Sequence, residues 1–337
     1  VMRRTLTILR AGPGTSIQDL GRPGQIGLGL SRGGAAERQG FIEGTALLGN
    51  DIQAAALELT IGGGRFQVSA PTRFAVSGAH APAKLNGAPV PHLTTATAAP
   101  GDQIDVGPAT DGVYSYLHLA GGILSPSELG GRGRHGIAGL GSNLADGDTF
   151  PLGDDPSPDA SPVLLRKRES ANKVLRVMPG PQTSLFSEED LDRFQSIAFT
   201  RSPKGNRQGV RLESDDKPFA SQGQLTLVSD IISEGDIQMT GDGTPYVLMA
   251  DCQTMGGYPR IGTIVPADLP AIAQARPGDT LRFRMISLDE AADTWISDQT
   301  YYRDVRSQLE PSVRNPWEIA DLLSYELVDR PGPEVTE

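Results

Sequence analysis

The chain has a single cysteine, Cys252, and few aromatic residues, which make up 5% of its 337 positions. One thiol cannot form a disulfide within the chain, so nothing points to an oxidising compartment. Sparse aromatic residues offer few platforms for stacking bases, and a formal net charge of −11 would repel a phosphate backbone. Nucleic acid is therefore not an expected partner, and the acidic balance is equally typical of an ordinary soluble protein.

Long apolar runs are also missing from the sequence. No stretch is long enough to span a bilayer, and the basic residues 1–12 contain no apolar segment of signal-peptide length. We therefore expect a cytoplasmic protein that makes no contact with a membrane.

The motifs of several common catalytic sites are absent. There is no G-x-x-x-x-G-K-[ST] phosphate loop, no H-E-x-x-H or paired-cysteine zinc motif, and no G-x-S-x-G nucleophile elbow. The chain also lacks the Met-Lys-Met tripeptide of a biotin carrier. No metal site is expected, and the scattered histidines are expected to have structural or surface roles: His80, His92, His118 and His135.

Residues 131–136 (GRGRHG) match the G-x-G-x-x-G pattern of dinucleotide-binding loops. No hydrophobic strand precedes them and no clear helix follows, so the context that this motif requires is missing. We instead expect a loop that carries Arg132 and Arg134 and could hold an anionic group.

Glycine and proline are abundant, with 41 and 26 residues, and this favours short strands joined by tight turns. In the first half, alternation predicts a strand at 3–10, and the glycines and prolines of 11–30 predict an irregular loop. A helix is predicted at 35–48, ending at Gly49-Asn50. Short strands are predicted over 56–119, where apolar and polar residues alternate as in antiparallel sheet.

The pattern restarts after residues 153–172, a stretch rich in proline, serine and charge that is typical of a linker. The second copy repeats the first in order and spacing: LRVMPGPQ at 175–182 resembles LRAGPGTS at 9–16, and ARPGDTLRF at 275–283 resembles AAPGDQIDV at 98–106. We therefore predict a mainly β protein with two tandem β-barrels, over residues 1–152 and 173–288.

A few helices complete the predicted fold. Ser187 is expected to cap a short helix, SEEDLDRFQ. Residues 289–337 form a predicted helical tail, in which Asn315-Pro316 would begin a helix that packs on a barrel or on a partner.

Polar residues gather on a glycine- and proline-shaped loop near the N-terminus. Gln18 offers a donor and an acceptor, Asp19 an acceptor, and Arg22 a forked cation. Together they suit an amide, urea or carboxylate group. The alternative is that Asp19 and Arg22 pair with each other and only fix the loop.

A second cluster follows the strand TPYVLMA, over residues 250–260. Its acceptors, donors and cation surround Gly256-Gly257: Asp251, Gln253, Thr254, Tyr258 and Arg260. Cys252 lies within it, but a lone thiol beside a strand with no histidine nearby in sequence indicates packing more than a nucleophile.

A third cluster spans residues 206–212. Alternation would place Arg207 and Arg211 on one side of a strand, where they could serve a site or only form surface salt bridges.

Together these clusters resemble the carboxyltransferase A/B family, which includes allophanate hydrolase subunit 2, the C subunit of 5-oxoprolinase and the antagonist of the sporulation-kinase inhibitor. Four segments carry the resemblance: AGPGTSIQDLGRPG at 11–24, LLGNDIQAAALELTIGG at 47–63, VMPGPQ at 177–182 and DCQTMGGYPRIGTIVPADLP at 251–270. The resemblance implies two cyclophilin-like barrels, in agreement with the internal repeat.

The resemblance also implies partners and cofactors. One partner would be a smaller, kinase-inhibitor-like subunit, and a third partner, of the lactam-utilisation type, could join them. The implied reactions are the ATP-dependent opening of 5-oxoproline to glutamate, or carboxyl transfer from biotin to urea. ATP would bind to a partner or at a shared interface, and biotin would be carried on another chain.

The family pattern implies a set of site residues. Asp19, Asp251 and Gln253 are the expected catalytic residues, with either aspartate as general base or orienting acceptor. Arg22 and Arg260 would bind a carboxylate or carbonyl oxygen, and Gln18 and Gln253 would orient the amide. The expected substrate-binding positions are Gln18, Arg22, Asn50, Glu58, Arg207, Thr254, Gly256, Gly257, Tyr258 and Arg260.

The sequence departs from the family pattern at four places. Cys252 replaces an arginine, Met255 a small hydroxyl residue, Glu37 an aspartate, and Gln208 the middle of an R-M-G triplet. Because Cys252 removes a cation that the family carries, the sequence does not determine whether the substrate is 5-oxoproline, urea, allophanate or another amide. It also keeps open the alternative of a regulatory or scaffold protein that binds and antagonises the smaller partner.

Overall fold

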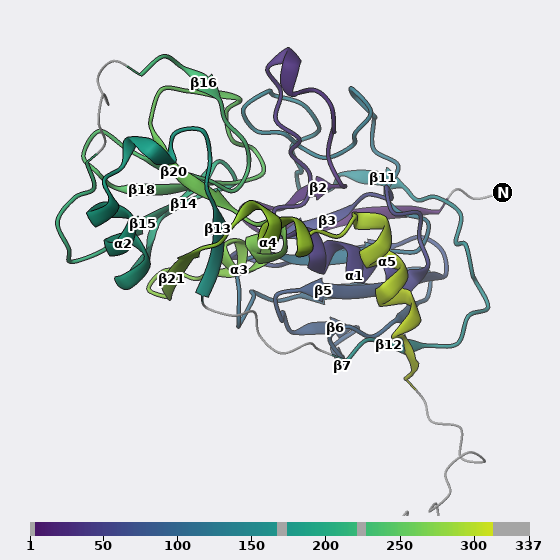
Figure 1. The fold of residues 1–337 in the computed structure, drawn as a ribbon. Helices are drawn as coiled ribbons and strands as arrows, with labels where there is room; N and C mark the ends of the chain where they lie inside the picture. The colour runs from purple at the N-terminus through teal and green to yellow at the C-terminus, as the bar shows by residue number, and fades with distance from the viewer. Residues whose placement is uncertain (1–3, 167–173, 221–226, 313–337) are drawn as a thin grey trace, which may run out of the picture.

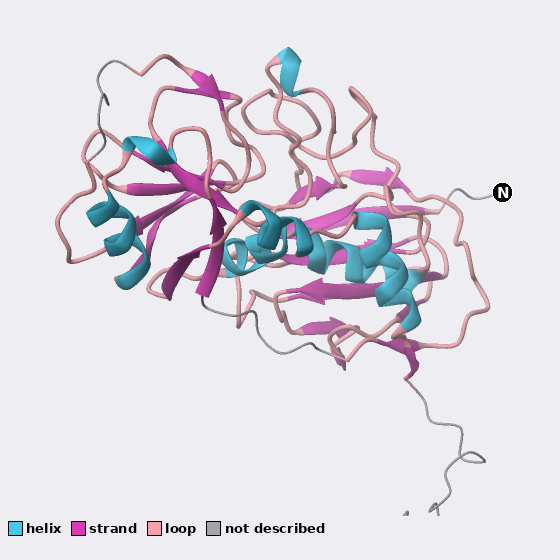
Figure 2. Cartoon of the chain, viewed as in Figure 1, coloured by secondary structure: helices cyan, strands magenta, loops and turns pink. Residues whose placement is uncertain are grey.

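The computed structural model describes residues 4–166, 174–220 and 227–312, and strands dominate it (Figure 1, Figure 2). The prediction of a mainly β protein with few short helices is confirmed. In the described part of the chain, no helix is both long and apolar enough to cross a membrane.

The first half contains two antiparallel sheets. The larger has the order β11-β1-β4-β9-β6-β7, with β1 Thr5–Ala11, β4 Gly64–Val68, β6 Ala83–Leu85, β7 Ala88–Val90, β9 Gln103–Val106 and β11 Thr149–Pro151. The smaller has the order β2-β3-β10-β5-β8, with β2 Ser16–Gln18, β3 Ala56–Leu59, β5 Thr72–Gly78, β8 Ala96–Ala98 and β10 Ser115–Leu119. Strand pairing does not join these two sheets into one closed ring.

The two sheets of the first half share one apolar core. Leu6 and Phe66 from the larger sheet pack with Leu57, Phe74 and Leu117 from the smaller one. These side chains come from alternate positions of their strands, so the alternation seen in the sequence marks the inner faces.

Helix α1 (Arg38–Leu48) covers the other face of the smaller sheet (Figure 1). The Glu37 carboxylate caps its first turn by accepting from the Gly40 N–H, and Gly49 ends it at a φ of 68°. Phe41 packs edge-on against Tyr116 of β10. Because β10 lies between the core and this helix, it is buried on both faces.

The second half contains a closed seven-stranded barrel with the order β13-β20-β17-β18-β15-β14-β21. Its strands are β13 Val174–Met178, β14 Phe199–Gly205, β15 Gly209–Glu213, β17 Asp236–Met239, β18 Pro245–Leu248, β20 Arg260–Ile264 and β21 Thr280–Met285. A parallel pairing of β13 with β21 closes the ring. The second predicted barrel is thus observed, whereas the first repeat takes the form of two facing sheets.

Several short helices and a two-stranded hairpin lie in the connections between the barrel strands. They are η2 Thr183–Leu185, α2 Glu188–Ser196, η3 Pro266–Asp268, α3 Leu269–Gln274, and a hairpin of β16 Asp230–Ile231 with β19 Met255–Gly256. As predicted, Ser187 caps α2 by accepting from the Asp190 N–H. A further short element, η1 Ile26–Leu28, lies in the shaped loop of the first half.

The tail returns to the first half of the molecule. It forms α4 (Leu288–Asp293) and α5 (Asp298–Ser307), and α5 packs along α1 (Figure 1). Tyr302 donates from α5 to the Asn50 carbonyl at 2.8 Å. Strand β22 (Glu310–Pro311) then pairs with β12 (Val163–Leu164), which lies in the predicted linker. The helix expected at Asn315-Pro316 falls outside the described residues.

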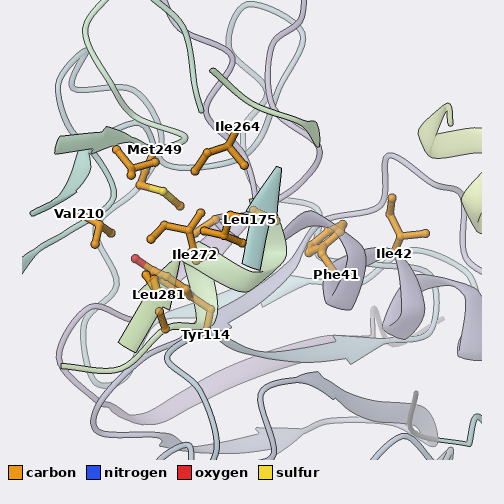
Figure 3. Close-up of a cluster of buried hydrophobic side chains, with 14 of the residues drawn as sticks. Phe41, Ile42, Tyr114, Leu175, Val210, Met249, Ile264, Ile272 and Leu281 are labelled. Carbon is orange, nitrogen blue, oxygen red and sulfur yellow. The ribbon is translucent and has the colours of Figure 1, made fainter. Parts of the chain in front are cut away.

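The two halves share a buried apolar cluster. Figure 3 shows Phe41 and Tyr114 of the first half together with Leu175, Ile272 and Leu281 of the second. Burial of apolar surface between the halves stabilises their relative orientation. Polar groups at the same junction are consequently held in fixed positions.

Candidate functional site

Arg207 connects the two halves at the edge of this shared cluster. It lies in the turn between β14 and β15, and its Nε and Nη2 donate to the two oxygens of Asp251 at 3.0 and 2.8 Å. Its Nη1 donates to Glu58 of the first half at 2.5 Å, and its Nη2 to the Gly34 carbonyl at 2.6 Å. Arg207 thus forms a bidentate ion pair with Asp251 and a second ion pair with Glu58 across the junction between the halves.

The carboxylates around Arg207 have no free oxygen. Glu58 is fully buried, and its second oxygen accepts from the Ala36 N–H and the Tyr116 hydroxyl. Asp251 also accepts from the backbone of Gly136 at 3.2 Å. Burial alone would lower the pKa of Arg207, but the charges of Glu58 and Asp251 outweigh it and raise that pKa. This Arg207 network therefore acts as an anchor between the halves.

Asp19 and Arg22 do not pair with each other in the described structure. Asp19 accepts from the backbone of Gly21 at 2.8 Å and of Arg132 at 2.5 Å. Arg22 donates to the carbonyl oxygens of residues 128 and 131 at 2.8 and 3.3 Å. The predicted alternative of a mutual ion pair is wrong, because each side chain binds backbone instead. Both side chains are almost fully buried.

The loop at 131–136 is held by the same cluster. Gln18 donates to the Arg134 carbonyl at 3.0 Å. The Arg134 guanidinium donates to Asn143 at 2.8 Å, and the Arg132 guanidinium donates to the Ser125 carbonyl. Both arginines of the GxGxxG-like segment thus donate to residues that flank it, and this does not support the expected role of the loop in holding an anionic group.

His135 lies buried in that loop. Its Nε2 is 2.9 Å from the Ser31 hydroxyl, and burial lowers its pKa. Its Nδ1 accepts from the Ala138 N–H at 3.3 Å, which assigns the ring proton to Nε2. His135 thus ties the loop at 131–136 to Ser31.

An open groove of about 770 Å³ lies on the outer face of the barrel, over β15, β17 and β18. Its lining combines amide side chains, two tyrosines, two cations and one carboxylate: Lys204, Gly205, Asn206, Gln208, Gly209, Arg211, Gln238, Thr240, Gly241, Asp242, Tyr246, Leu248, Gln253 and Tyr258. Such a lining offers many donors and acceptors to a polar ligand.

The floor of the groove is formed by a row of three side chains, one from each of β15, β18 and β17. Arg211 pairs with Tyr246, and Tyr246 pairs with Gln238 in the strand register. The neighbouring residues Val210 and Val247 belong to the barrel core. Because successive side chains alternate between faces, Arg211, Tyr246 and Gln238 all point outward.

The groove walls are tied to the Arg207 network. The Asp251 N–H donates to the Arg207 carbonyl at 2.7 Å, and the Met249 N–H donates to the Gln208 carbonyl at 3.0 Å. These bonds fix the turn at 206–208 beside the start of the loop at 251–258. The network thereby positions both walls, and Gln253 and Tyr258 of the second wall are exposed to solvent.

Arg260 lies away from the groove in a buried cluster of its own. It donates to Asp236 at 3.2 Å, to the Ile231 carbonyl at 2.6 Å, to Gln182 and to Asp230. The expected role of Arg260 in binding a carboxylate or carbonyl of the substrate is not supported, because the protein already occupies its donors. Arg260 instead holds the β16 hairpin on the barrel.

The remaining predicted positions have backbone or distant roles. Asn50 lies at the far end of α1, where it donates to the Leu119 carbonyl and accepts from the Gly121 N–H. The Thr254 carbonyl accepts from the Ile232 N–H at 3.0 Å in the β16 hairpin. A Cβ at Gly256 would lie 2.6 Å from the Gln238 amide nitrogen, so a larger residue here would displace the Gln238 side chain. A Cβ at Gly257 would meet only ordinary contacts, the nearest being the Ser229 hydroxyl at 3.5 Å.

Sequence reasoning missed several groove residues. Lys204, Gln238 and Tyr246 were not singled out. Gln238 stands alone among apolar neighbours in the strand DIQM, and an isolated polar residue at an outward position was the available signal. Arg207 and Arg211, predicted to share one side of a strand, separate because Arg207 precedes β15 and turns toward the first half.

Comparison with known proteins places these features in a family. The model of the carboxyltransferase domain, subdomain A and B, matches residues 28–285. The chain belongs to this family.

The carboxyltransferase-domain relatives fall into two groups. The chain is 32% identical to the C subunit of 5-oxoprolinase from Escherichia coli (strain K12), over 90% of this chain and 98% of the relative. It is 29% identical to a putative urea carboxylase of Emericella nidulans, over 85% of this chain and 24% of the relative. The relatives are thus parts of enzymes, and the chain spans a small share of the fungal one.

Solved structures confirm the fold of the carboxyltransferase domain. The urea carboxylase of Kluyveromyces lactis superposes with a TM-score of 0.81 at 27% identity, covering 93% of this chain and 31% of that one. The protein TTHA0988 gives a TM-score of 0.75 at 27% identity, covering 84% of this chain and 56% of that one.

The structure explains two of the departures from the family pattern. Cys252 is 2% exposed and packs against Ile232 and Leu248, and burial raises its pKa to about 12. A thiol in that state is inert, so the packing role is supported. Glu37 caps α1, and a Cβ at residue 40 would lie 2.3 Å from its carboxylate, so the longer acid is accommodated by Gly40.

Proposed function

We propose that this carboxyltransferase-domain chain is the large subunit of an ATP-dependent amide-processing enzyme that opens 5-oxoproline, and that the groove on the second barrel binds the amide. The observation that carries the proposal is the groove itself, in which Gln253, Gln238 and Arg211 surround one open volume. The end-to-end likeness to the C subunit of a 5-oxoprolinase supports this substrate over urea.

Within the proposed site the residues bind and orient. An amide side chain such as Gln253 donates to a substrate carbonyl and accepts from its N–H. Tyr258 and Tyr246 present rings with polar tips to a small cyclic substrate. Fixed donors at the carbonyl oxygen would stabilise the negative charge that develops there when the amide is attacked.

Asp19 and Asp251 are not assigned as general bases. Asp251 is bound by Arg207 and by the Gly136 N–H, and Asp19 is bound by two backbone N–H groups. We propose instead that both aspartates maintain the geometry of the groove and of the loop at 131–136.

We propose that ATP and, if it is used, biotin are brought by partner chains. The sequence carries neither a phosphate loop nor a biotin-carrier tripeptide. The groove contains one carboxylate, Asp242, and Thr240 and the Thr244 N–H already donate to it. This donor set does not fit a magnesium-bound triphosphate, whose ion prefers several free oxygen ligands.

The test is an assay of the chain co-purified with the products of its neighbouring genes. The complex is given ATP and 5-oxoproline, and the glutamate formed is measured. Glutamate that appears only with all subunits and ATP supports the proposal. A stable complex that consumes no ATP and makes no glutamate with 5-oxoproline contradicts it, and urea and allophanate are then tried as substrates.

The occupied aspartates favour a second candidate, a scaffold that aligns a catalytic partner. Six large apolar side chains are exposed around the loop at 253–258 and the nearby η1 and β16 segments: Ile26, Leu28, Val228, Ile231, Met255 and Tyr258. Exposed apolar residues of this kind are typical of a protein interface. A scaffold would keep full turnover when Gln253 is replaced, whereas a substrate-binding subunit would lose it.

A further inference from the structure

Two buried donors in the groove floor make no hydrogen bond in the described part of the protein: Gln238 Nε2 and Arg211 Nε. Arg211 Nε lies 3.7 Å from a Glu213 carboxylate oxygen, which is an ion pair without a hydrogen bond. Buried polar groups without partners are costly, and they are uncommon in folded proteins unless a ligand or water satisfies them. Their position in the lining of an open groove points to a ligand that supplies acceptors.

The spacing of the two donors suits one small molecule with two acceptor groups. Arg211 and Gln238 lie on strands separated by β18, so their backbones are about 10 Å apart, two strand spacings of about 4.8 Å. Tyr246 lies between them in the row, and the long arginine side chain can reach across part of this separation.

The charges of the groove favour an anion at the Arg211 end. Lys204 lies in the same lining, and Glu213 is 3.7 Å from Arg211 while accepting from the Ser202 hydroxyl at 2.8 Å. The groove carboxylate, Asp242, accepts from the Thr240 hydroxyl and the Thr244 N–H. Lys204 and Arg211 are the two cations of the lining, and a ligand carboxylate can pair with them.

We propose that Arg211 and Gln238 form the specificity-determining pair of this site, in which Arg211 binds a carboxylate and Gln238 donates to the amide carbonyl of the same molecule. The inference rests on the proposed function and deepens it. A cyclic amide that bears a carboxylate satisfies both donors. Urea has no carboxylate and gives the Arg211 guanidinium no anion beyond Glu213, so the pair selects against it.

The test is direct binding, measured calorimetrically with the chain in complex with its co-purified partners and no ATP. The probes are 5-oxoproline, which has carboxylate and lactam, 2-pyrrolidinone, which has only the lactam, and urea. The variants are Arg211→Gln, Arg211→Lys and Gln238→Leu. Arg65→Gln is the matched control, since Arg65 pairs with Asp105 on the exposed face of the larger sheet, across its central strands β4 and β9.

We expect Arg211→Gln to weaken binding of 5-oxoproline by about tenfold or more, because a charge-assisted hydrogen bond is lost. Arg211→Lys should restore part of this loss, and binding of 2-pyrrolidinone should change by less than about twofold. Gln238→Leu should weaken both lactams while leaving the fold intact, since it removes a donor that has no protein partner.

The inference is overturned if Arg211→Gln binds 5-oxoproline within about twofold of the wild type, or if the wild type does not bind 5-oxoproline or prefers urea. Its failure is distinguishable from that of the proposed function. If Arg211→Gln still forms glutamate in an ATP-dependent manner with unchanged KM, only the assignment of the Arg211–Gln238 pair is wrong. If 5-oxoproline binds tightly and Arg211-dependently but is not turned over, only the proposed reaction is wrong.

Discussion

Arg207 of the second half lies 2.5 Å from Glu58 of the first, two residues 149 positions apart in the chain. The pair is the polar counterpart of the apolar cluster between the halves. Since the same guanidinium also holds Asp251, one side chain joins the β-sheets of the first half to the groove wall of the second.

Replacement of Arg207 by methionine should lower the free energy of unfolding by about 3–5 kcal/mol, because it leaves two buried carboxylates without their cation. Urea denaturation at neutral pH measures the loss, and the double variant with Glu58→Gln should recover part of it. Arg65→Met, at an exposed pair, should cost no more than about 1 kcal/mol. If Arg207→Met and Arg65→Met lowered the free energy of unfolding equally, Arg207 would not be an anchor between the halves.

Glu37 should make stability depend on pH. Burial raises its pKa from 4.5 to about 7 in the folded protein. A raised carboxyl pKa stabilises the fold fully below about pH 4.5, and this contribution is lost as the pH rises through about 7, by about 3 kcal/mol in total. Glu37→Gln should remove the dependence, so its stability relative to the wild type should increase between pH 4.5 and 8.

Unfolding free energies across that pH range test the Glu37 prediction. Glu189→Gln is the control, because Glu189 is 75% exposed and pairs with Lys217 on the surface. A difference between Glu37→Gln and the wild type that stays constant with pH would contradict the expectation.

Gln253→Ala should reduce kcat/KM for the amide substrate by about tenfold or more, since the substrate loses a hydrogen-bonding partner. The change should leave the unfolding free energy within about 0.5 kcal/mol, as Gln253 is exposed. Steady-state kinetics of the complex supply the measurement, with exposed Gln53→Ala, outside the groove, as the matched control. Unchanged kinetics would favour the scaffold.

Cys252 should be dispensable for catalysis. With its pKa raised to about 12 by burial, the thiol stays protonated at pH 8 and should react with Ellman's reagent far more slowly than free cysteine. Cys252→Ala should retain turnover and cost about 1 kcal/mol of stability through lost packing. Rapid labelling of the native protein, or an inactive alanine variant, would reverse this assignment.

The sequence by itself determined the β-rich class, the internal repeat and one end of each of two helices, α1 and α2. The Ser187 cap of α2 and the Gly49 end of α1 were predictable because each depends on residues within one helical turn. Alternation likewise identified strands, since the period of two is a local property of the chain.

Only the tertiary structure decided what the polar residues do. Asp19 and Arg22 are close in sequence but bind separate backbone groups, and Arg207 and Arg211 serve different parts of the molecule. A polar side chain takes whichever partner the fold brings near it, and for Arg207 that partner comes from the other half of the chain. The partners of buried polar side chains such as Arg207 are thus long-range properties, and no local pattern contains them.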